Sequence, residues 1–151
     1  MGKLFSILFI GLFSFTICSF ERQEISTSKL TVLLDNIRNK EGNIFIFIYN
    51  YENQFPDNPF LHFEINKNLV SDFGTLKFII PKSLTTGKYA VSILDDENAN
   101  EDLDMFLGIP SEGYGFSNNV SPFFSLPNYD ELLFDLAGNK KTIYLTLQYI
   151  L

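Results

Sequence analysis

Short apolar runs separated by turn residues constrain the fold of this chain more than any other feature. After the N-terminal segment, no stretch of ten or more residues has apolar residues at the spacing of an amphipathic helix. The runs are rich in β-branched and aromatic residues, as strands are. They predict an all-β fold, a single antiparallel β-sandwich of about seven strands. The runs cover residues 30–34, 44–49, 61–65, 74–80, 89–94, 132–137 and 143–149.

Three of these runs carry more specific predictions. The run 44–49 is apolar on both faces, so we expect it to be a central strand. In the run 61–65, strand alternation turns His62, the sole histidine, outward. The last two runs are joined by the turn signal Gly138-Asn139-Lys140, so we expect them to pair with each other.

The N-terminal segment has the order of a signal peptide. A positive start with Lys3 precedes the apolar run 4–17, and the small residues Cys18 and Ser19 follow. We therefore expect a signal peptide at 1–19, one domain at 20–151, and export to the periplasm, the outer membrane or the medium. Cys18 is the only cysteine, and it is either removed with the signal or lipidated. Membrane attachment is expected only in the second case.

The charge of the chain limits its partners. The formal net charge is −7, and the longest basic run is Lys140-Lys141. Nucleic acid is therefore not expected as a partner, because binding to it depends on neutralising phosphates. Glycans, peptides and envelope proteins remain as expected partner classes.

A long ordered loop is expected between the fifth and sixth strands, and its first part is acidic. Residues 95–104 contain six acids and no base. Alternate oxygen-bearing residues suit a chain that curls round Ca²⁺. Glu101 and Leu107 stand where such a loop usually has glycine and a bidentate glutamate. A Ca²⁺ site and a solvated acidic loop therefore both remain open. The candidate ligands are Asp96, Asn98, Asn100, Asp104 and the backbone carbonyl of Asp102.

The second part of this loop, 108–119, is rich in glycine, aromatic residues and amides. One interpretation is an ordered loop whose rings dock on the edge of the sandwich. The other is a recognition surface for a sugar or an extended peptide, in which rings stack and amides form hydrogen bonds. Its candidate binding residues are Glu112, Tyr114, Phe116, Asn118 and Asn119.

The motifs of this loop resemble the domain of unknown function 2141 family. The resemblance rests on Asp96-Glu97-Asn98-x-Asn100-x-x-Leu103-Asp104 and on the run from Phe106 to Asn119, and it extends over nearly all of the chain after the signal. It implies an exported sandwich of the immunoglobulin-like or transthyretin-like kind and supplies no activity. Relatives commonly have a histidine at position 95 and glycines at 99 and 101. Asp95 is therefore interpreted as an added oxygen donor.

No catalytic residues are predicted. The chain has no nucleophile-elbow motif, and His62 is expected to face outward. The alternative is a carbohydrate-active hydrolase that uses Glu112 with Asp104 or Asp96, because glycoside hydrolysis needs only two suitably spaced carboxyl groups. The sequence favours a binding or structural module of the cell envelope or extracellular space over an enzyme.

Overall fold

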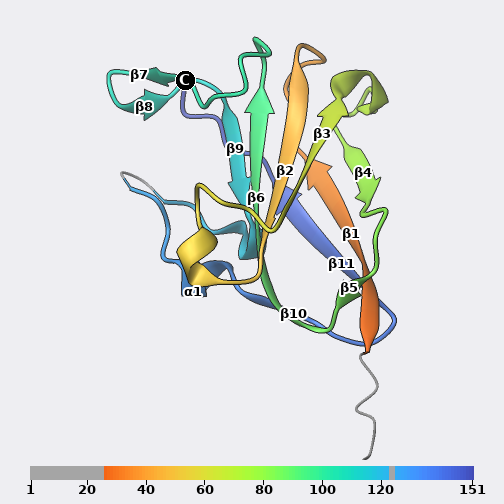
Figure 1. The fold of residues 1–151 in the computed structure, drawn as a ribbon. Helices are drawn as coiled ribbons and strands as arrows, with labels where there is room; N and C mark the ends of the chain where they lie inside the picture. Colours follow the sequence, from red (N-terminus) through yellow and green to blue (C-terminus); the bar gives the residue numbers. More distant parts are fainter. Residues whose placement is uncertain (1–25, 123–124) are drawn as a thin grey trace, which may run out of the picture.

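The computed structural model describes residues 26–122 and 125–151 (Figure 1). The predicted signal peptide and Cys18 lie outside these residues. Among them, no helix has the length and apolar character needed to cross a bilayer. The strands are β1 (Thr27–Asp35), β2 (Asn43–Tyr49), β3 (Leu61–Asn66), β4 (Leu76–Ile79), β5 (Leu84–Thr85), β6 (Gly87–Asp96), β7 (Met105–Phe106), β8 (Ile109–Pro110), β9 (Gly113–Phe116), β10 (Phe134–Leu136) and β11 (Lys140–Thr146). The helices are α1 (Tyr129–Leu132) and the short 3₁₀ turns η1 (Glu52–Gln54), η2 (Lys67–Leu69) and η3 (Ser117–Asn119).

Two sheets form the body of the protein. The first has the order β11-β1-β4, with β5 also paired to β1, and the second has the order β10-β6-β2-β3, with β9 also paired to β6. All pairings are antiparallel except that of β1 with β11. The predicted all-β sandwich is confirmed, although the described residues form eleven strands rather than about seven.

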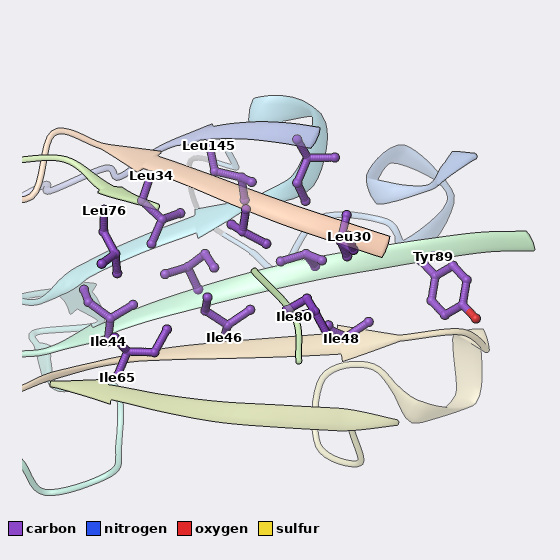
Figure 2. Packing of buried hydrophobic residues seen from close by; sticks show 14 of the residues in the cluster. Leu30, Leu34, Ile44, Ile46, Ile48, Ile65, Leu76, Ile80, Tyr89 and Leu145 are labelled. Atoms are coloured by element: carbon purple, nitrogen blue, oxygen red, sulfur yellow. The ribbon is translucent and has the colours of Figure 1, made fainter. Parts of the chain in front are cut away.

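The core lies between the two sheets and is built from alternate residues of their central strands (Figure 2). Leu30 and Val32 of β1 and Ile46 and Ile48 of β2 are all fully buried. Burying a side chain of this size contributes about 1.5–3 kcal/mol. The prediction that 44–49 is a central strand is confirmed, because β2 lies between β3 and β6. His62 is exposed, also as predicted.

The expected pairing of the last two runs is wrong. Strand β10 pairs with β6 in the second sheet, whereas β11 crosses to the first sheet and pairs with β1 in parallel. Gly138 at the turn between them has a φ of 68°, which glycine adopts without steric cost. A turn signal shows where the chain reverses direction, but it does not determine which strand the following strand pairs with. The long parallel register with β1 here satisfies the main chain of β11.

The expected loop after the fifth strand is also only partly a loop. It contains the β7–β8 hairpin and strand β9, which extends the second sheet. Strand β9 has the sequence Gly113-Tyr114-Gly115-Phe116, and its glycines hide the usual apolar alternation. A Cβ at Gly113 would collide with the ring of Tyr149, so the close packing of β9 requires glycine there.

Candidate functional site

Most of the candidate residues gather around the C-terminal end of β6 and the chain that follows it, whereas Asn118 and Asn119 lie beyond β9, in η3. We call residues 97–104 the acidic loop. It begins after Asp96, the last residue of β6, and leads into the β7–β8 hairpin and then β9. Because β9 returns along β6, Gly113 lies opposite Asp95, close to the start of the acidic loop.

Asp96 holds the acidic loop through hydrogen bonds to its main chain. Its side chain is fully buried, and its carboxylate accepts the backbone N–H of Asn100 at 3.1 Å and of Glu101 at 2.9 Å. Glu101 has a φ of 67° and Ala99 a φ of 59°, so both adopt the left-handed conformation that glycine favours. The loop thus curls tightly although neither position is glycine.

The other predicted metal ligands contact one another. Asp104 accepts the side-chain amides of Asn98 at 2.5 Å and Asn100 at 3.1 Å, and Asn100 Oδ1 accepts the N–H of Asp102 at 2.9 Å. In the described part of the chain, no group of three or more Asp, Glu, His or Cys side chains is placed to share a metal ion. Calcium binding by this loop stays a prediction.

Glu112 joins the two ends of the acidic loop. It is 4% exposed, and its two carboxylate oxygens accept the N–H of Glu97 at 2.9 Å and the N–H of Asp104 at 3.1 Å. Both oxygens are thus directed at the main chain. This arrangement holds the loop closed, and it differs from the free acid and base that a hydrolase would use.

The remaining candidate binding residues divide into two groups. Tyr114 and Phe116 are buried and pack together, with ring centroids 5.9 Å apart. The Asn118 amide donates to the carbonyls of Glu131 and Leu133. The amide of Asn119 bonds to the main chain of β11. The structure therefore separates the rings of Tyr114 and Phe116 from the two asparagine amides. The amides connect η3 to residues 131–133 and to β11 of the same chain.

The two rings line an apolar groove on the outer face of the second sheet. Two cavities of about 180 and 160 Å³ share Leu103, Tyr114, Phe116 and Leu126 as lining residues. Met105 and Pro110 of the hairpin line one end. We call this surface the aromatic groove; at its other end it is lined by Phe47, Tyr49 and Phe55.

The β7–β8 hairpin stands beside this groove and exposes apolar side chains. Met105 is 53% exposed, Phe106 62%, Leu107 87% and Ile109 38%. Figure 1 shows the hairpin projecting away from the two sheets. Sequence reasoning overlooked it, although the signal was present: an unbroken apolar run around Gly108 interrupts an otherwise polar segment.

A buried polar cluster lies on the other side of the acidic loop. Lys67 and Asp95 are fully buried and form an ion pair at 2.6 Å, and the Tyr149 hydroxyl donates to the same carboxylate. Lys67 also donates to Asn39 at 2.7 Å. Burial raises the pKa of Asp95, although its bonds to Lys67 and Tyr149 oppose the shift. The predicted role of Asp95 as an added metal ligand finds no support in these contacts, because its oxygens face Lys67 and Tyr149.

An exposed ion pair covers this cluster. Arg38 donates to both carboxylate oxygens of Glu97 at 2.7 Å, and its guanidinium lies 4.4 Å from the centre of the Tyr149 ring. The hydrogen bond from Arg38 lowers the pKa of Glu97. The start of the acidic loop is thus attached to the loop between β1 and β2.

Comparison with protein-family models matches residues 32–144 to the family described as an uncharacterized protein conserved in bacteria, DUF2141. The chain belongs to the DUF2141 family. Searches of curated proteins and of solved structures found no match.

The DUF2141 match spans the acidic loop, the hairpin, β9 and the Lys67–Asp95 pair, whereas Tyr149 lies beyond it. The description of the family names no activity. A function for this DUF2141 member must therefore come from the geometry of the groove, the hairpin and the loop.

Proposed function

We propose that this DUF2141 member is an exported binding module that docks an apolar segment of another polypeptide. The segment lies in the aromatic groove and against the β7–β8 hairpin. One observation carries the proposal: four large apolar side chains of a single hairpin are exposed beside an apolar groove. Such patches on a protein surface commonly mark interaction sites.

The division of the groove into two small cavities suits an extended polypeptide segment. Pockets that enclose small molecules measure about 300–1,000 Å³. The two cavities of the groove measure about 180 and 160 Å³. Each therefore fits a side chain, and the two together fit an extended segment with two apolar anchors. Tyr114 and Phe116 line the groove but are mostly buried, so the exposed side chains of the hairpin provide most of the contact surface.

The acidic loop favours a partner with basic residues next to its apolar anchors. Arg38 pairs with Glu97 and Lys67 pairs with Asp95. The described ion pairs include none for Glu101 and Asp102, which are exposed beside Leu103 of the groove. Charges at the rim of an interface increase the association rate and the selectivity more than the affinity.

Selection from a displayed peptide library tests this proposal. The wild-type chain should enrich peptides with two apolar anchors flanked by Lys or Arg. A Phe106→Ser/Leu107→Ser variant should lose that enrichment. Phe73→Ser is the matched control, because Phe73 is 92% exposed but lies between η2 and β4. Enrichment of the same peptides by the double variant would contradict the proposed surface.

Export is a separate part of the proposal and has its own test. N-terminal sequencing of the chain recovered from the native type of cell should give a start after Cys18 or Ser19 in the envelope or medium fraction. A chain that keeps Met1 and stays in the cytosol would contradict export while leaving the docking surface untouched.

A further inference from the structure

A buried amine lies between a carboxamide and a carboxylate under the acidic loop. Lys67 Nζ is 2.7 Å from Asn39 Oδ1 and 2.6 Å from Asp95 Oδ1, and the side chains of Lys67 and Asp95 are fully buried. The proposed docking surface uses none of these three residues. Their arrangement places a nucleophile beside an electrophilic carbonyl and a proton acceptor.

We propose that Lys67 and Asn39 form an intramolecular isopeptide bond. In this reaction Nζ attacks Cγ of the Asn39 carboxamide, and the amide nitrogen leaves as ammonia. No oxidant, reductant or further reactant is needed.

The carboxamide of Asn39 is held by contacts that suit an electrophile. Its Oδ1 accepts the backbone N–H of Glu41 at 3.0 Å as well as the Lys67 amine. Negative charge develops on this oxygen during attack, and a fixed N–H donor stabilises that charge. The leaving nitrogen, Nδ2, donates to Glu97 Oε1 at 2.7 Å. A simple ion pair between Lys67 and Asp95 requires none of these contacts.

Asp95 is the group that makes the amine nucleophilic. An ammonium group cannot attack, so Lys67 must first transfer a proton, and Asp95 Oδ1 is in direct contact with it. Both groups are fully buried, and removal from water disfavours a charged pair relative to the neutral amine and carboxylic acid. The Tyr149 hydroxyl donates to the other oxygen of Asp95 and fixes the carboxylate in place.

The reaction balances in atoms and protons. The Lys67 ammonium gives one proton to Asp95, and its free lone pair forms the new C–N bond to Cγ. A second proton passes from Nζ to Nδ2, and the third remains on the new amide. The bond from Cγ to Nδ2 then breaks. Ammonia leaves and takes the proton from Asp95 as ammonium.

Mass spectrometry of the purified full chain tests the proposal. After denaturation, the intact mass should be lower by about 17 Da, the mass of ammonia, than the mass calculated from the observed N-terminus. Digestion should give a branched peptide that joins Asn39 to Lys67. The exposed Lys82 provides a control: Lys82→Arg should keep the mass loss, whereas Lys67→Arg and Asp95→Asn should lack it.

The wild-type measurement is decisive even if a variant fails to fold. A wild-type chain at its calculated mass, with free Asn39 and Lys67 in the digest, would overturn the proposal. A loss of about 18 Da with a branch at Asp95 would overturn it too, because condensation with a carboxyl group releases water.

Discussion

Asp95 and Asp96 are adjacent, fully buried carboxylates at the end of β6, yet their surroundings differ completely. Asp95 faces the Lys67 side-chain nitrogen and the Tyr149 hydroxyl. Asp96 instead accepts two backbone N–H groups of the acidic loop, and the described ion pairs do not include it. Successive residues of a strand point to opposite faces, so one residue step separates the two environments.

This difference shows that the carboxylates at and after the end of β6 are stabilised in two ways. On one side a lysine amine from a distant part of the chain contacts the carboxylate. On the other side carboxylates order the loop itself, by bonding to N–H groups that would otherwise lack partners. Both arrangements fix the chain at the end of β6, where the acidic loop begins. We therefore expect the acidic loop, and the β7–β8 hairpin that follows it, to be rigidly attached to the second sheet.

The largest effect is expected from removal of the buried Lys67 side chain. Lys67→Met leaves Asp95 buried without its partner amine and also prevents the proposed bond to Asn39, so we expect a loss of at least about 3–5 kcal/mol of unfolding free energy. Urea denaturation measures this loss, and Lys82→Met serves as the exposed control. A change in Lys67→Met no larger than in the control would show that Asp95 does not depend on the lysine.

A smaller loss of unfolding free energy is expected from a substitution of Glu112, which holds the acidic loop. Glu112→Gln keeps one acceptor oxygen and points an amide N–H₂ at a backbone donor, so one charge-assisted bond is lost. Such a bond contributes about 1.5–3 kcal/mol. The same denaturation assay should show the decrease, together with faster proteolysis within residues 97–104. Wild-type stability in this variant would mean that Glu112 does not hold the loop.

The pH dependence of stability separates the covering ion pair from the buried one. Arg38 lowers the pKa of Glu97 from its usual 4.5. The stabilisation from this pair is therefore present above pH 4.5 and is lost as the pH falls through the lower folded-state pKa. Below pH 4.5, the wild type should lose stability more steeply than Glu97→Gln. Parallel curves for the two proteins would contradict the assignment.

The smallest effect is expected from calcium. An ion at the acidic loop would have to displace the Asn98 and Asn100 amides from Asp104, so we expect weak binding. At a Ca²⁺ concentration near Kd, the melting temperature should rise by about 1–3 °C. EDTA should reverse the rise, and Asp104→Asn should abolish it. A melting temperature independent of Ca²⁺ would end the calcium hypothesis for this loop.

Local sequence patterns predicted the elements well and their long-range partners poorly. Apolar alternation is a local property, so it identified β2 as central and turned His62 outward. Strand β9 was missed because glycines interrupt its apolar alternation. The pairing of β10 with β11 was predicted from the turn between them, and a turn carries no information on which strand each one pairs with. Lys67 stands in the polar run Asn66-Lys67-Asn68, and nothing local distinguishes it from an exposed lysine. Its burial depends on Asp95 and Asn39, which lie far away in the sequence.

Amide hydrogen exchange of the metal-free protein shows whether buried carboxylates hold the acidic loop in one shape. Glu97, Asn100, Glu101 and Asp104 lie outside the strands, and their N–H groups donate to Asp96 or Glu112. We expect these four amides to exchange slowly, and we expect Glu112→Gln to accelerate the exchange of the Glu97 and Asp104 amides. Exchange of all four at the rate of an unstructured peptide would contradict it.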